Sequence, residues 1–135
     1  MEKKINVTTA QEITEALKAL GNSDKAKHLS RFFKTGKGQY GEGDLFIGIT
    51  VPEQRNIAKK YLYTDFEDLA SLIDSPYHEV RLTALLIVVY KFEKTKSPDL
   101  RSQCVDFYLR HTRYINNWDL VDLTCYKLLG VWLTD

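Results

Sequence analysis

Apolar residues recur at three- and four-residue spacings along most of this chain, which is the periodicity of amphipathic helices. The pattern separates into seven segments, each long enough for at least two helical turns. We therefore predict an all-α fold. The predicted helices span residues 9–20, 22–35, 52–62, 65–74, 76–93, 98–114 and 117–133.

Side chains that favour the first turn of a helix stand at the start of five of these segments. Serine, threonine and aspartate accept hydrogen bonds from the free amides at a helix N-terminus, and proline is favoured at the first helical position. Two of the serines each precede a proline. The residues that we expect to cap helices are Thr9, Ser23, Asp65, Ser75 and Ser97.

The helical pattern also repeats along the sequence. Pro52, Pro76 and Pro98 are separated by 24 and 22 residues. A shift of 41 residues places Val80–Thr83, which reads Val-Arg-Leu-Thr, on Val121–Thr124, which reads Val-Asp-Leu-Thr. A period of this length is typical of HEAT-like helix pairs, which stack into a curved superhelix with one concave binding face. We therefore predict a HEAT-like α-solenoid.

The composition agrees with one helical domain. The chain has 135 residues, of which 44% are hydrophobic, so it can form one core but not two, and we interpret residues 1–135 as a single domain. Its 7 glycines and 3 prolines are too few for a turn-rich β fold. It has no long apolar stretch and no signal-peptide pattern, so we expect a cytoplasmic protein without membrane contact.

The charge distribution permits nucleic-acid binding without requiring it. The net charge is +1, but residues 1–64 carry 11 basic and 7 acidic residues, whereas residues 65–135 carry 8 and 11. Several basic side chains either line a concave face and contact phosphates, or are simply solvated on helix surfaces. These are Lys59, Lys60, Arg81, Lys91, Arg110 and Arg113.

The cysteines and histidines do not form a pattern typical of a metal or catalytic site. Cys104 and Cys125 have neither zinc-ligand nor disulfide-framework spacing. His28, His78 and His111 fall on separate predicted helices, where we expect them to be exposed to solvent. The sequence thus predicts no metal and no cofactor.

Residues 36–51 form a glycine-rich connection between two predicted helices. Gly36, Gly38 and Gly41 have the spacing of a dinucleotide-binding motif, but a helix precedes them where that motif requires a strand. Two interpretations remain: a flexible interhelical loop, or a loop whose lack of side chains lets it approach a ligand backbone. In the second interpretation the contributing side chains are Lys34, Lys37 and Tyr40.

A carboxylate lies among aromatic and apolar residues in the last predicted helix. Trp118 and Asp122 are about 40° apart on that helix. A buried ionised carboxylate needs a structural partner, a bound proton or a cationic ligand. Asp122 therefore either forms a salt bridge with an arginine such as Arg81 or Arg113, or presents an acid beside an aromatic platform. The second arrangement suits a cationic substrate or a positive charge that develops in a transition state.

Two long motifs carry a resemblance to a known family. Residues 31–53 read Arg-Phe-Phe-Lys-Thr-Gly-Lys-Gly-Gln-Tyr-Gly-Glu-Gly-Asp-Leu-Phe-Ile-Gly-Ile-Thr-Val-Pro-Glu, and residues 116–122 read Asn-Asn-Trp-Asp-Leu-Val-Asp. Both resemble the DNA alkylation repair family of AlkD-type DNA glycosylases, and the resemblance covers essentially the whole chain. It implies a superhelix of HEAT-like helix pairs that binds double-stranded DNA along its basic concave side. The implied reaction is hydrolysis of the N-glycosidic bond of cationic purines alkylated at N3 or N7.

The resemblance also implies roles for single residues. The family's Trp-x-x-x-Asp pair falls on Trp118, which would pack against the DNA backbone at the lesion, and Asp122, which would stabilise the oxocarbenium-like sugar and help position water. Phe32 replaces a family tyrosine near the lesion, and Thr50 stands where some members carry glutamine. The residues expected to contact DNA are Phe32, Lys34, Lys37, Tyr40, Thr50, Arg81, Arg113 and Asn117.

The preferred interpretation is a monomeric DNA-repair N-glycosylase, and the alternative is a non-catalytic HEAT-like module that binds DNA or a protein. Family members continue beyond the end of this sequence, and the last predicted helix is apolar on more than one face. We therefore expect the N-terminal part of a longer protein. An arginine that the family supplies from a later helix would follow Asp135, which leaves open whether residues 1–135 are active by themselves.

Overall fold

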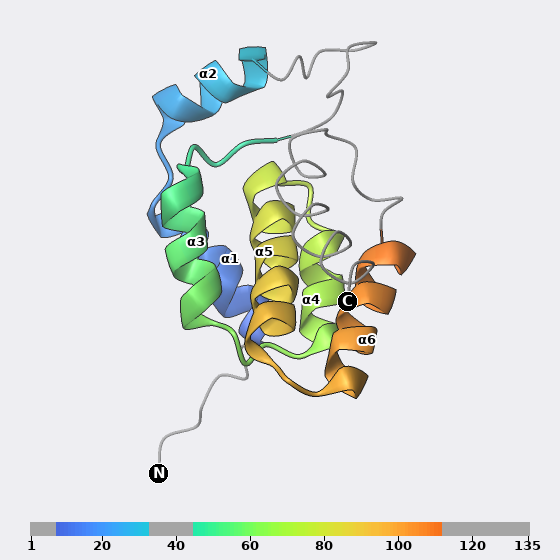
Figure 1. The fold of residues 1–135 in the computed structure, drawn as a ribbon. Helices are drawn as coiled ribbons and strands as arrows, with labels where there is room; N and C mark the ends of the chain where they lie inside the picture. The colour runs from blue at the N-terminus through green and yellow to red at the C-terminus, as the bar shows by residue number, and fades with distance from the viewer. Residues whose placement is uncertain (1–7, 33–44, 112–135) are drawn as a thin grey trace.

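The computed structural model describes residues 8–32 and 45–111, and the structural statements below concern these residues (Figure 1). Their regular structure is helical, apart from one isolated bridge between Leu45 and Tyr77. The prediction of an all-α fold is confirmed over this part of the chain. The helices are α1 (Thr9–Ala19), α2 (Ser23–Phe32), α3 (Val51–Lys60), α4 (Phe66–Ile73), α5 (His78–Lys94) and α6 (Pro98–Arg110).

All six helices begin within two residues of the predicted positions. Helix α6 ends at Arg110, earlier than the predicted end at residue 114. The seventh predicted helix, 117–133, lies outside the described residues, and so does the second copy of the 41-residue repeat.

Two of the predicted helix caps are confirmed. The Asp65 side chain accepts a hydrogen bond from the Asp68 amide at 2.8 Å and caps α4. The Ser97 hydroxyl accepts one from the Leu100 amide at 3.3 Å and caps α6, with proline at the first helical position. Both caps satisfy amides that have no partner within their own helix.

The other three predictions of cap residues are wrong. Thr8 caps α1 in place of Thr9, and Asn22 accepts a hydrogen bond from the first turn of α2 in place of Ser23. Helix α5 begins without a side-chain cap, because the Ser75 hydroxyl accepts a hydrogen bond from the amide two residues later, before the helix starts. Neighbouring polar residues compete for the same cap, and the chain direction into the helix decides between them.

Helix α5 forms the centre of the bundle and contacts α1, α3, α4 and α6 (Figure 1). Residues 78–89 are all buried, so the first three turns of α5 have no solvent-exposed side. A helix that is buried all round is typical of the centre of a helical protein. Leu85 and Phe92 of α5 belong to one apolar core with Ile13 and Leu17 of α1.

Successive helices after α2 alternate in direction. In Figure 1, α3 and α5 run downward, whereas α4 and α6 run upward. Short connections between antiparallel helices produce this alternation. The result is that α3 and α5, which are in contact, run in the same direction.

Residues 45–50, which lead into α3, lie against the turn between α1 and α2. The Asn22 amide donates to the carbonyl oxygens of Ile47 at 3.1 Å and Gly48 at 3.2 Å. Gly48 has φ +91°, and a Cβ atom there would lie 2.0 Å from the Asn22 carbonyl oxygen. Only glycine fits this position. Residues 45–50 are not helical, as predicted, and α3 begins at Val51, within the predicted loop 36–51.

Candidate nucleic-acid interface

The structure describes three of the ten predicted site residues. Thr50 precedes α3, Arg81 lies on α5, and Phe32 ends α2. The other seven, which include the Trp118 and Asp122 pair, lie outside the described residues. These seven are Lys34, Lys37, Tyr40, Arg113, Asn117, Trp118 and Asp122.

Thr50 is exposed at the N-terminus of α3, where it forms a capping box with Glu53. The Thr50 hydroxyl accepts a hydrogen bond from the Glu53 amide at 3.3 Å, and the Glu53 carboxylate accepts one from the Thr50 amide at 3.0 Å. The amide and then the hydroxyl of Thr50 hold the pKa of the Glu53 carboxyl below its usual range. Thr50 thus has a clear structural role, and its exposure leaves it accessible to a ligand.

Arg81 is buried, with 6% of its surface exposed. Its Nη1 atom donates a hydrogen bond of 2.9 Å to the Ser75 carbonyl oxygen, which lies in the connection between α4 and α5. This placement favours a structural role for the guanidinium over direct contact with a DNA phosphate. The alternative prediction, a salt bridge between Arg81 and Asp122, involves a residue outside the described ranges.

Glu79 connects the start of α5 to the segment that leads into α3. It was not predicted as a site residue from the sequence. It lies in the first turn of α5 and is only 1% exposed. One carboxylate oxygen accepts a hydrogen bond from the Ile47 amide at 2.9 Å. The other accepts from the amides of Gly48 at 2.9 Å and Ile49 at 3.4 Å. A single buried carboxylate therefore holds three consecutive amides of the segment that leads into α3.

The start of α5 makes further contacts with the same segment. The His78 amide donates to the Leu45 carbonyl oxygen at 2.8 Å, and the Leu45 amide donates to the Pro76 carbonyl oxygen at 3.2 Å. The His78 ring stacks on the ring of Phe46, with centroids 4.8 Å apart. His78 is 3% exposed, so the prediction that it is solvated is wrong, because residues 45–49 cover the beginning of α5.

We call these paired stretches the clasp: residues 45–49 on one side and residues 76–79 on the other. One signal for the clasp was present in the sequence, namely an acidic residue at the edge of the long apolar stretch of α5. An unpaired carboxylate is costly in such a place, so it had to find donors. The sequence did not indicate that these donors would be backbone amides some 30 residues earlier in the chain.

The predicted basic residues differ in their availability to a nucleic acid. Lys59 and Lys60 are exposed in the last turn of α3, and the Lys59 ammonium lies 5.7 Å from the centre of the Tyr90 ring. Arg110 is exposed but forms an ion pair of 2.9 Å with Asp106 on the same helix. The first two could meet a phosphate without breaking a salt bridge that the structure records.

Lys91 is less suited to that role. Its side chain is partly buried, and its ammonium lies 5.9 Å from the centre of the Phe66 ring. Burial lowers the pKa of the Lys91 ammonium, and nearby Cys104 and Asp65 oppose that shift. The cation is thus already shielded by aromatic and apolar neighbours.

The described residues include neither a reactive thiol nor a group of side chains with the geometry of a metal site. Cys104 is fully buried, and burial raises the pKa of its thiol to about 11, so it is protonated and unreactive near neutral pH. Within residues 8–32 and 45–111, no group of histidine, cysteine or acidic side chains has the geometry of a metal site. In the same ranges, none of the helices is both long and apolar enough to cross a membrane.

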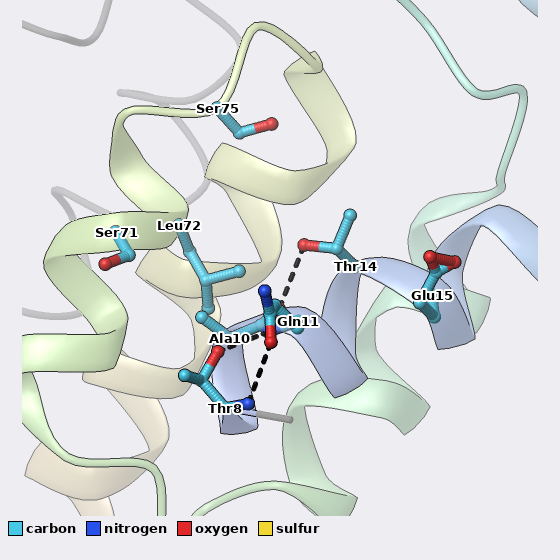
Figure 2. Close-up of a pocket in the computed structure, with 8 residues that line it drawn as sticks. All are labelled: Thr8, Ala10, Gln11, Thr14, Glu15, Ser71, Leu72 and Ser75. Carbon is cyan, nitrogen blue, oxygen red and sulfur yellow. Dashed lines mark hydrogen bonds between the residues drawn. The ribbon is translucent and has the colours of Figure 1, made fainter. Parts of the chain in front are cut away.

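A groove between α1 and α4 has a volume of about 430 Å³ and is lined mainly by uncharged polar side chains (Figure 2). Several of these are committed to local hydrogen bonds: Thr8 pairs with Gln11, and the Thr14 hydroxyl donates to the Ala10 carbonyl oxygen at 2.9 Å. Glu15 is the only ionisable side chain in the lining. The groove therefore lacks the paired acid and base that hydrolysis within it would require.

Comparison with known proteins identifies a family. No curated protein and no solved structure matches this chain significantly. A family model described as DNA alkylation repair enzyme matches residues 13–135, a range that includes the clasp, Thr50 and both motifs noted in the sequence. The chain therefore belongs to the DNA alkylation repair enzyme family.

Proposed function

We propose that this protein is a DNA N-glycosylase that releases cationic, N3- or N7-alkylated purines from double-stranded DNA. The observation that carries the proposal is the family match over residues 13–135, within which the Trp118-x-x-x-Asp122 pair is intact. Family membership supports a role in DNA alkylation repair, and the Trp-Asp pair supports the specific reaction.

The proposed chemistry needs little from the protein beyond electrostatics. In the alkylated purine the base already carries a positive charge, so it leaves with the electron pair of the C1′–N bond as a neutral molecule. The sugar becomes an oxocarbenium-like cation, and Asp122 stabilises that charge. A water molecule adds to C1′ and loses a proton, which completes the hydrolysis. A carboxylate placed where positive charge develops is an effective catalyst of such a step.

Trp118 and the DNA-contacting residues would position the substrate. Trp118 would pack against the sugar-phosphate backbone beside the lesion, one turn from Asp122 on the helix predicted from the sequence. The exposed side chain of Thr50 and the exposed lysines of α3 supply contacts to the backbone elsewhere. Because Arg81 is buried, we assign it a structural role. The other proposed contacts are Phe32, Lys34, Lys37, Tyr40, Arg113 and Asn117.

We further propose that residues 1–135 belong to a HEAT-like solenoid. The alternating directions of α3 to α6 and the parallel contact between α3 and α5 support this arrangement, because stacked helix pairs place equivalent helices side by side. The 41-residue repeat would place the next such helix at residues 117–133.

Base release from methylated duplex DNA tests the proposal. We expect the protein to liberate 3-methyladenine or 7-methylguanine, quantified by chromatography, and to leave the unmethylated duplex intact. Replacement of Trp118 by alanine should weaken both DNA binding and release, since the indole contacts the backbone. A folded protein that binds DNA but releases no base would instead support the non-catalytic binding module.

A further inference from the structure

The carboxylate of Glu79, in the clasp, accepts hydrogen bonds from three consecutive backbone amides. Three successive backbone amides pointing at one place form a cradle of the kind that binds anions in proteins. Here the cradle of residues 47–49 is filled by the protein's own Glu79, with N···O distances of 2.9, 2.9 and 3.4 Å. Both carboxylate oxygens are used, and 1% of the residue is exposed.

The two sides of this contact differ in structure. Glu79 lies on α5, which is buried on all sides over its first three turns. Residues 45–49 are not helical, and Gly48 adopts a left-handed conformation. Glu79 on the buried helix and the Asn22 amide together set the position of the segment, and the three hydrogen bonds to the carboxylate are the contacts from α5.

The segment ends directly at Thr50, the exposed cap of α3. The last amide held by Glu79, that of Ile49, belongs to the residue before Thr50. A displacement of residues 47–49 would move Thr50 and the first turn of α3, while leaving the core of α5 in place.

We infer that Glu79 is a positioning residue for DNA binding: its carboxylate fixes residues 47–49 and thereby places Thr50 and the N-terminus of α3 against the DNA backbone. This inference rests on the proposed function, since it presumes that Thr50 faces DNA. Glu79 itself touches no substrate.

The test compares Glu79→Gln with Glu93→Gln, using duplex DNA with and without methylated purines as the probe. Glu93 is an exposed residue of the same helix, so the control makes the same change in charge away from the clasp. We expect Glu79→Gln to raise the Kd for both duplexes about tenfold, which corresponds to about 1.4 kcal/mol. The rate of base release at saturating protein should be unchanged. Glu93→Gln should behave like the wild type.

Several readouts separate positioning from a merely structural role. Kd values are corrected for the folded fraction, measured by circular dichroism, so a loss of stability alone does not change them. Addition of Thr50→Ala to Glu79→Gln should weaken binding no further, because both changes remove the same contact. If Glu79→Gln does not fold, Glu79→Asp takes its place, since it keeps the charge and shortens the reach to the three amides.

The outcomes distinguish this inference from the proposed function. An unchanged Kd in a folded Glu79 variant, with base release by the wild type, would overturn the positioning role and leave the glycosylase proposal standing. Binding without release in the wild type would contradict the glycosylase proposal, and the Kd comparison would still decide the role of Glu79. A wild type that does not bind DNA would overturn both.

Discussion

At the scale of single residues, Thr50 combines a structural role with a proposed functional one. It caps α3 through a reciprocal pair of hydrogen bonds with Glu53, and its side chain is exposed. Ser97 caps α6 in a similar way, without the returning bond from a glutamate. The two residues therefore form a natural pair for separating stability from DNA binding.

We predict that Thr50→Ala and Ser97→Ala each lower the free energy of unfolding by about 1 kcal/mol, because each leaves an amide of the first helical turn without its partner. Urea denaturation measures this loss. Only Thr50→Ala should also raise the Kd for duplex DNA. Equal DNA affinity in the two variants would exclude Thr50 from the interface.

The residues also show what sequence reasoning can and cannot locate. Asp65 and Ser97 were found because a helix cap depends on neighbours within three residues. The buried position of His78 was not predicted, because burial depends on which distant segment covers a residue. Glu79 was missed for the same reason, since its partners lie some 30 residues away.

At the scale of elements, the segment that leads into α3 depends on the absence of a side chain at Gly48. Its φ of +91° is strained for any other residue, and a Cβ atom would lie 2.0 Å from the Asn22 carbonyl oxygen. The turn before α2 is thus packed directly against this segment, backbone to backbone.

We predict that Gly48→Ala lowers the free energy of unfolding by at least about 2 kcal/mol, from backbone strain together with steric overlap. Gly21→Ala is the graded comparison. Its Cβ would lie 2.6 Å from the Cγ2 atom and 2.9 Å from the carbonyl oxygen of Ile47, a smaller overlap than at Gly48 and without a positive φ, so its cost should be smaller. An equal cost at the two glycines, measured by urea denaturation, would show that the conformation of Gly48 is not the determining factor.

Hydrophobic periodicity predicted α1 and α3 to α6 well because each has buried apolar residues on the side that faces the core, as Ile13 and Leu17 in α1 illustrate. The continuous apolar stretch of α5 indicates a buried helix, and the structure places it at the centre. The pattern carries no information on residues 45–49, whose conformation is set by hydrogen bonds to α5 and to the turn at Asn22.

At the scale of the whole molecule, the buried central helix α5 holds residues 47–49, which lead into α3, where we propose that DNA binds. The net charge of +1 is small, so affinity for DNA must come from the local distribution of cations. The exposed lysines of α3 are described candidates for such contacts, whereas Arg110 is engaged with Asp106.

We predict that Lys59→Ala reduces the slope of log Kd against log salt concentration by about 0.9 if Lys59 contacts one phosphate of duplex DNA. Arg110→Ala, which also removes one positive charge, should leave the slope unchanged. Fluorescence anisotropy over a range of salt concentrations provides both slopes. Identical slopes in wild type and Lys59→Ala would show that Lys59 does not contact a phosphate.

A single-turnover measurement tests the proposal that Asp122 stabilises the sugar cation. The rate of 3-methyladenine release from duplex DNA at saturating protein is compared for the wild type, Asp122→Asn and Asp119→Asn. Asp119→Asn removes the other carboxylate of the same predicted helix, about 60° from Asp122 and 100° from Trp118. We predict that Asp122→Asn lowers the rate at least about 100-fold with unchanged DNA affinity, whereas Asp119→Asn keeps the wild-type rate. Release at the wild-type rate by a folded Asp122→Asn variant would contradict the account.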